Sequence, residues 1–110
     1  SDAINKGVNL SSGEIVTFLL ADDVLSDKNA FAIAAEAFDS DSNLGMLFSA
    51  IRVTDPAGLA QDRIDYSNPK ELYRRVALNF PGSFYRKSLL DNPTMDCSYK
   101  IANDYEFVCR

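Results

Sequence analysis

Two adjacent carboxylates, Asp22 and Asp23, directly follow a short apolar run at residues 14–20. Such a run after a glycine turn predicts a buried strand, and ligands of open α/β sheets collect beyond the carboxyl ends of strands. Two carboxylates there can hold a hard divalent cation, which can neutralise a diphosphate leaving group. The alternative is a turn with two solvated acids before a helix, and the pair taken alone favours this alternative.

Asp104 is the second acidic candidate, at the start of a helical pattern over residues 102–110. A carboxylate within hydrogen-bond reach of a hydroxyl can act as a general base. An acid at the start of a helix also has a structural role, because it accepts hydrogen bonds from free N–H groups and complements the helix dipole. Taken alone, the position of Asp104 at a helix start favours the structural role.

Basic and aromatic residues give weaker candidates for substrate contact. Arg86 and Lys87 form a basic pair, with solvated surface charges as the alternative. Four tyrosines could line an acceptor groove and stack on sugar faces, although tyrosines are more often core or rim residues. These are Tyr66, Tyr73, Tyr85 and Tyr99. The acidic segment 39–43 lacks the glycine and the final glutamate of an EF-hand, so we expect a solvated loop.

Composition speaks against several kinds of chemistry. The 110 residues contain no histidine, and the only cysteines, Cys97 and Cys109, form no CxxC. These facts disfavour a zinc site and a Ser-His or Cys-His nucleophile. The cysteines could form a disulfide, but we expect reduced thiols. With 11 basic and 16 acidic residues the net charge is −5, which disfavours nucleic acid as a partner. No secretory signal or membrane-spanning run is visible.

The elements that must position these residues alternate between helical and strand-like patterns, which predicts a single α/β domain over residues 1–110. Helices are predicted at residues 4–10, after a cap at Ser26 or Asp27, at 69–77 and at 102–110. In the second helix, Phe31, Ala34, Ala35 and Phe38 share one face. Strands are predicted at 14–20, 44–53, 59–66 and 84–86, with a hairpin turn at 55–58.

The order and spacing of the first segments resemble the middle of inverting family-two glycosyltransferases. Their usual pattern is an Asp-Ala-x-Asn-Lys-Gly helix, a Thr/Ser-Gly-Glu/Asp turn, an apolar strand and a motif ending in Asp-Asp. This chain has Asp-Ala-Ile-Asn-Lys-Gly at 2–7, Ser-Gly-Glu at 12–14 and Ala-Asp-Asp at 21–23. By this resemblance Asp22 and Asp23 match the motif for the metal and the nucleotide diphosphate. Leu20 departs from the Asp or Asn that many members carry there.

Two later blocks resemble the same family. Residues 96–110 resemble a block in which Asp-Tyr-Asp/Glu precedes an apolar helix ending in Arg, and Asp104 matches its catalytic base. Residues 80–89 resemble His-x-Ala/Gly-Thr-Phe-x-Arg-Arg-Ser-Leu, with Phe80 in place of the common histidine. The candidate substrate contacts that the resemblance implies are Asn5, Lys6, Arg86, Lys87 and Tyr105.

The resemblance implies a partial GT-A sheet with mixed strands and flanking helices, corresponding to the C-terminal portion of the catalytic domain. The nucleotide-binding half that precedes this region in the family has no counterpart here. We therefore expect a fragment of an enzyme that transfers a sugar, with inversion, from a nucleotide-diphosphate sugar to a saccharide or lipid-linked acceptor hydroxyl. The implied cofactor is Mn²⁺ or Mg²⁺, and the implied process is bacterial polysaccharide biosynthesis.

Three further expectations accompany this reading. The isolated chain is expected to be inactive or nearly so, and to self-associate through an exposed sheet edge. The expected location is cytoplasmic, with any membrane association of the parent protein made by other segments. The alternative is a non-catalytic α/β interaction module derived from the same fold, which Leu20, Phe80 and the missing half favour.

Overall fold

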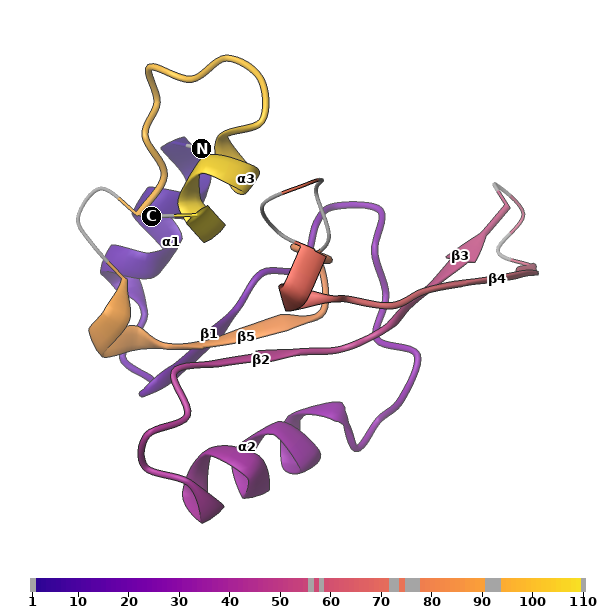
Figure 1. Cartoon of the computed structure of the whole chain (residues 1–110), viewed down its shortest axis with the longest axis horizontal. Coiled ribbons are helices and arrows are strands. Elements are labelled where there is room, and N and C mark those ends of the chain that lie inside the picture. Colours follow the sequence, from indigo (N-terminus) through magenta and orange to yellow (C-terminus); the bar gives the residue numbers. More distant parts are fainter. Residues whose placement is uncertain are drawn as a thin grey trace.

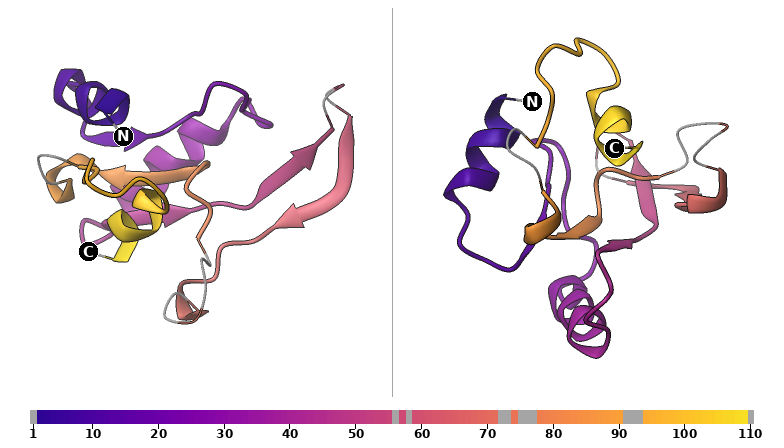
Figure 2. Two further views of the ribbon diagram at one scale, coloured as in Figure 1. Left: turned by 90° about the horizontal axis from the view of Figure 1, so that it is seen from above. Right: turned by 60° about the vertical axis from the view of Figure 1, so that its left-hand side comes forward.

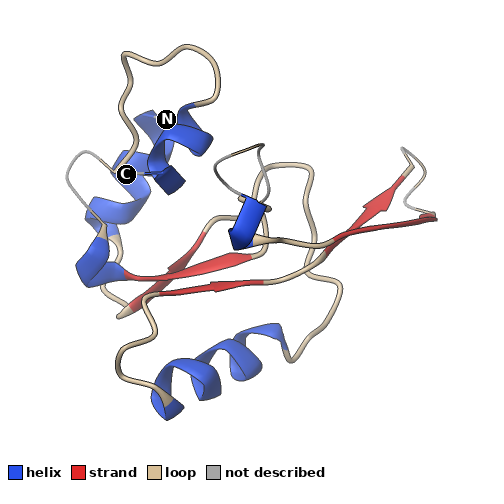
Figure 3. Cartoon of the chain, in the orientation of Figure 1, coloured by secondary structure: helices blue, strands red, loops and turns tan. Residues whose placement is uncertain are grey.

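A computed structural model describes residues 2–55, 57, 59–71, 74, 78–90 and 94–109. Helices cover both faces of a small three-stranded sheet, and a β-hairpin projects to one side (Figures 1 and 3). This arrangement confirms the α/β class. In chain order the elements are α1 (Asp2–Leu10), β1 (Ile15–Thr17), α2 (Ala30–Ser40), β2 (Met46–Phe48), β3 (Ile51–Thr54), β4 (Ala60–Asp65), η1 (Pro69–Glu71), β5 (Ser83–Arg86), η2 (Lys87–Leu89) and α3 (Asn103–Cys109).

β5 is the central strand of the three-stranded sheet, with β1 on one side and β2 on the other. The register places Val16 and Met46 on either side of Tyr85. Every strand pair in the described residues is antiparallel, so the expected mixed sheet is not found there. β1 and β2 do run in the same direction, but β5 separates them.

The three-stranded sheet separates two hydrophobic cores. On the face covered by α1 and α3, the buried residues are Val8, Phe18, Phe80, Tyr85 and Met95. On the opposite face, beneath α2, they are Ala34, Phe38 and Phe84. Neighbouring residues of β5 therefore serve different cores, because successive side chains of a strand point to opposite faces.

The strand predicted at 44–53 is two strands in the structure. β2 ends at Phe48 and pairs with β5, whereas β3 begins at Ile51 and pairs with β4. At the break, the N–H and the hydroxyl of Ser49 both donate to the carbonyl of Gly82, at 3.3 and 2.7 Å. Gly82 has a φ of +75°, and a Cβ there would lie 2.6 Å from the Ser49 hydroxyl, so this turn requires glycine.

The predicted antiparallel hairpin is confirmed by β3 and β4. Its turn is closed by Asp55, whose N–H donates to the carbonyl of Leu59 at 2.9 Å. The Asp55 carboxylate accepts from the N–H groups of Ala57 and Leu59, each at 2.9 Å, as in other turns that begin with Asp. The hairpin extends away from the three-stranded sheet (Figure 2).

Several predicted bounds change in the structure. β1 stops at Thr17 instead of residue 20, because its ladder with β5 ends at the Thr17–Phe84 pair. α2 begins at Ala30 without a side-chain cap, and Asp27 instead accepts the N–H of Asn29 at 2.8 Å. α2 also continues to Ser40, into the predicted loop. Of the helix predicted at 69–77, only the 3₁₀ turn η1 and residue 74 are described.

The apolar face predicted for α2 is narrower than expected. Ala34 and Phe38 are buried, but Ala35 is exposed and Phe31 keeps 53% of its surface accessible. Phe31 still meets the ring of Phe84 edge-on, with centroids 6.1 Å apart. α2 therefore packs on the sheet through one line of residues.

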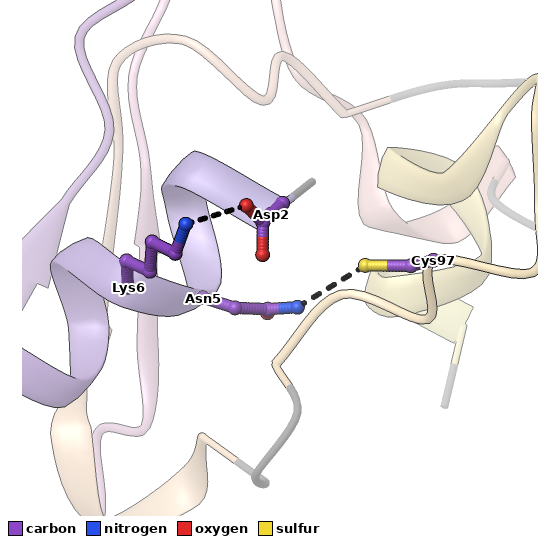
Figure 4. Close-up of polar contacts among 4 residues, drawn as sticks. All are labelled: Asp2, Asn5, Lys6 and Cys97. Carbon is purple, nitrogen blue, oxygen red and sulfur yellow. Dashed lines mark hydrogen bonds and ion pairs between the residues drawn. The ribbon is translucent and has the colours of Figure 1, made fainter.

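A side-chain clamp joins α1 to the segment before α3. The Asn5 amide donates to the carbonyl of Met95 at 2.8 Å and accepts its N–H at 2.7 Å. The same amide contacts the sulfur of Cys97 at 3.5 Å (Figure 4). Met95 is only 1% exposed, so water cannot replace these bonds. Asn5, a candidate substrate contact, thus fixes the fold.

We predict that Asn5→Ala destabilises the 110-residue chain by about 2–3 kcal/mol, because two hydrogen bonds are lost and the buried N–H of Met95 is left unpaired. Urea unfolding measures the change. Asn9→Ala is the matched control, since Asn9 is exposed on the same helix and gains the same helix propensity. Equal unfolding midpoints for the two variants would contradict the clamp.

Candidate functional site

Asp22 and Asp23 lie in a turn on the C-terminal side of β1. The N–H of Asp23 donates to the carbonyl of Leu20 at 3.1 Å, which closes the turn. Asp22 is exposed, whereas Asp23 is half-buried. One carboxylate oxygen of Asp23, Oδ2, is shielded from solvent and has no hydrogen-bond partner among the described residues. Buried polar atoms are normally paired, so this unpaired oxygen is an exception.

The turn presents two adjacent carboxylates, one exposed and one half-buried. Among the described residues, no three histidine, cysteine or acidic side chains cluster to form a complete metal cage. Magnesium sites at nucleotides, however, commonly use one or two carboxylates and take further ligands from phosphates and water. A shielded and unpaired carboxylate oxygen beside an exposed carboxylate is consistent with that kind of site.

Asp104 lies in the first turn of α3 and is half-buried. Its Oδ1 accepts the N–H of Tyr105, the next residue, at 2.9 Å, whereas a capping side chain accepts the N–H two or three residues ahead. Ala102, just before the helix, has a φ of +60°. A residue with a Cβ is strained in this left-handed conformation by roughly 1–2 kcal/mol. The strain lies two residues before the candidate base.

Four aromatic rings connect the two acidic positions; we call Phe18, Phe80, Tyr85 and Phe107 the aromatic cluster. Phe18 stacks on Phe80 with centroids 5.0 Å apart and rings 10° from parallel. Phe107 of α3 meets Phe18, Phe80 and Tyr85 at 6.5, 6.2 and 5.3 Å. Phe18 precedes the Asp22 turn and Phe107 follows Asp104 on α3. The cluster therefore attaches α3 to Phe18, which follows β1 and precedes the acidic turn.

Tyr85 carries the polar group within the cluster. It is 1% exposed, and its hydroxyl has no hydrogen-bond partner among the described residues. Burial raises the pKa of Tyr85 to about 12; the nearby Ser83 side chain lowers the pKa, and the negative charge of Asp104 raises it. The Ser83 hydroxyl itself donates to the carbonyl of Asn79. Tyr85 is thus a buried phenol that keeps its proton at neutral pH.

The basic pair is engaged in holding the fold. The Arg86 guanidinium donates to the carbonyls of Leu44 and Phe38 at 3.1 and 3.3 Å, and lies 5.2 Å from the Phe38 ring centre. It therefore satisfies a carbonyl near the end of α2. The Lys87 ammonium donates to the carbonyl of Ser11, and the backbone N–H of Lys87 donates to the carbonyl of Glu14 at 2.8 Å. Arg86 and Lys87 therefore donate to carbonyl groups of the fold, which differs from the alternative of two solvated surface charges.

A depression of about 500 Å³ lies beside the basic pair, lined by Gly13, Glu14, Arg86, Lys87 and Ser88. It is at the start of β1, because Ile15 pairs with Arg86 in the register. Asp22 and Asp23 follow the opposite end of that strand. The depression is therefore separate from the candidate site.

Lys6 and Tyr105 also have partners on their own helices. Lys6 forms an exposed ion pair with Asp2 at 2.8 Å, one turn away on α1 (Figure 4). This contact lowers the pKa of Asp2 and raises that of Lys6. Interaction with Cys109, one turn further along α3, raises the pKa of Tyr105.

The remaining candidates are dispersed. Tyr85 is too deeply buried to stack on a sugar, whereas Tyr66 and Tyr99 are 74% and 50% exposed. Tyr73 lies outside the described residues.

Cys97 and Cys109 are both free and exposed, as expected for reduced thiols. No helix in the described part of the chain has the length and apolarity needed to cross a membrane.

Comparisons with protein-family profiles, with curated proteins and with solved structures find no match to this chain. The resemblance to family-two glycosyltransferases therefore stays a prediction from sequence motifs. What the structure adds is the grouping of the aromatic cluster with the acidic turn and α3. The helical pattern over residues 102–110 did not identify Phe107 as a core contact. Phe107 is the α3 residue that packs against the core, and Cys109 is exposed.

The raised pKa of Tyr85 predicts a pH dependence of stability. A tyrosine whose pKa is about 12 when folded and about 10 when unfolded stabilises the fold fully below pH 10. As pH rises from 10 towards 12, the unfolded state loses its proton first, so this stabilisation falls by about 1.4 kcal/mol per pH unit.

The measurement compares the unfolding free energies of wild type and Tyr85→Phe at pH 8 to 11. The difference between them should stay constant up to about pH 10 and then change in favour of Tyr85→Phe. Tyr99→Phe, at a 50% exposed tyrosine, is the control and should follow wild type. Parallel curves for Tyr85→Phe and wild type would contradict the burial of a neutral phenol.

Proposed function

We propose that this chain forms the middle and acceptor-side part of an inverting, nucleotide-sugar-dependent glycosyltransferase of GT-A type. The shielded, unpaired oxygen of Asp23 carries the proposal. A carboxylate oxygen kept from water without a partner is unfavourable unless a ligand completes it. The order and spacing of the motifs at 2–7, 12–14 and 21–23 support the same reading.

In this proposal the acidic turn is the donor side of the site. Asp22 and Asp23 would hold a divalent cation, Mn²⁺ or Mg²⁺, which when bound supplies positive charge to the diphosphate of the leaving nucleotide. The turn between Leu20 and Asp23 fixes the backbone that carries both carboxylates. Leu20 itself is 42% exposed and offers the nucleotide an apolar surface instead of a polar contact.

The first turn of α3 is the acceptor side of the proposed site. Asp104 takes the proton from the acceptor hydroxyl as that oxygen attacks the anomeric carbon, because a hydroxyl is a weak nucleophile while it keeps its proton. The helix-start bond from the Tyr105 N–H fixes one oxygen of Asp104 and leaves further lone pairs to accept that proton. The aromatic cluster supports α3 against β1 and β5.

A metal titration tests the donor side. Addition of Mn²⁺ with UDP should broaden the amide NMR signals of residues 20–24, because the paramagnetic ion lies beside them. Asp23→Asn should weaken this binding at least tenfold, since a charged ligand is lost (roughly 1.4 kcal/mol per factor of ten). Asp39→Asn is the matched control, with the same charge change at an exposed position on α2. Equal broadening in all three proteins would contradict the proposed metal site.

A non-catalytic interaction module is the second candidate, and exposed apolar residues favour it. Leu19, Leu20, Val24 and Leu25 flank the acidic pair and are 42–82% exposed. The outer edge of β1 has no strand partner among the described residues, and such an edge can pair with another chain. On this reading the chain self-associates. Light scattering that shows a monomer at high concentration would remove this support.

A further inference from the structure

The depression of about 500 Å³ at the start of β1 has no role in the proposed reaction. It is lined by Gly13 and Glu14, which precede β1, by Arg86, which ends β5, and by Lys87 and Ser88, which begin η2. Its volume lies within the range of about 300–1,000 Å³ that is usual for small-molecule sites. The acidic turn follows the other end of β1, so a ligand in the depression would be distinct from the nucleotide sugar.

Strand pairing fixes the backbone that carries the two cations of this lining. The N–H of Arg86 donates to the carbonyl of Gly45, just before β2, at 2.8 Å. The N–H of the next residue, Lys87, donates to the carbonyl of Glu14, just before β1, also at 2.8 Å. Residues 86 and 87 are therefore held from both sides of the central strand, and their side chains extend from a rigid strand end.

Both cations are half-buried and keep donors that a ligand can use. The Lys87 ammonium donates to the carbonyl of Ser11, and the Arg86 guanidinium donates to the carbonyls of Leu44 and Phe38. An ammonium has three N–H donors and a guanidinium has five, so further donors remain on each. In the described part of the chain, neither cation forms an ion pair with a carboxylate. A partly buried charge without a counter-ion is unfavourable, so the lining favours an anion.

We propose that the depression binds a phosphate group carried by a small molecule, through the Arg86 guanidinium, the Lys87 ammonium and the Ser88 hydroxyl. A phosphate group has three acceptor oxygens and a charge of about −1.5 to −2 at pH 7, which suits two cations better than the single charge of a carboxylate. The Glu14 carboxylate also lines the depression and weakens binding by its like charge. The inference does not rest on the proposed glycosyltransferase activity.

Titration with inorganic phosphate tests the site in the 110-residue chain, with EDTA present so that no metal binds the acidic turn. Amide NMR signals of residues 13–14 and 86–88 should shift with saturation and a Kd on the order of 1 mM, whereas those of residues 20–24 should not. Lys87→Gln should weaken binding about tenfold, because a charged donor is lost, while its amide can still donate to Ser11. Lys70→Gln, with the same charge change at an exposed lysine on η1, is the matched control.

Glu14→Gln tests the site in the opposite direction without removing a bond of the fold, because the Glu14 carbonyl still accepts from Lys87. It should strengthen phosphate binding about two- to fivefold, since a like charge is removed. In wild type, acetate should bind about tenfold more weakly than phosphate. Shifts that do not saturate, equal affinity in wild type and both variants, or acetate binding as tight as phosphate would overturn the proposal. A failed manganese titration would instead contradict the donor site and leave this site standing.

Discussion

The pairing of β5 with both β1 and β2 is the constraint on which the rest of the structure depends. It joins segments far apart in the chain: the Thr17 hydroxyl donates to the carbonyl of Ser83 across 66 positions, at 2.8 Å. Closing such a loop costs only slightly more than closing a shorter one, because loop entropy grows with the logarithm of length. Burial of both faces of β5 offsets that cost, since Phe84 and Tyr85 are each less than a tenth exposed.

Because side chains alternate along β5, its neighbouring residues contact different helices. Phe84 and Arg86 face α2, where Arg86 holds the helix end and stacks on Phe38. Tyr85 faces α1 and α3, where the candidate base lies. Arg86 and Lys87 were expected to contact substrate, but their hydrogen bonds mainly stabilise the fold. The Tyr85 hydroxyl on this strand is buried without a hydrogen-bond partner among the described residues.

Elements that depend on local patterns could be predicted from the sequence, and contacts between distant segments could not. The hairpin follows from Asp55 and its turn, and β5 and α3 lie close to their expected bounds. The break within residues 44–53 depends on Ser49 meeting Gly82, which no local pattern encodes. For the same reason Asn5 was read as a substrate contact, because its partner Met95 is 90 positions away.

The candidate site could likewise be predicted only in part from the sequence. The sequence identified Asp22, Asp23 and Asp104 as candidates. The shielding of an Asp23 oxygen and of the Tyr85 hydroxyl from solvent arises only in the folded chain. Each unpaired group costs about 1–3 kcal/mol, against a total stability of about 5–15 kcal/mol for a domain. Phenylalanine would fill the place of Tyr85 without that cost. Groups kept unpaired and shielded from water bind a polar ligand more strongly than groups already solvated, which is the preorganisation that a catalytic site requires.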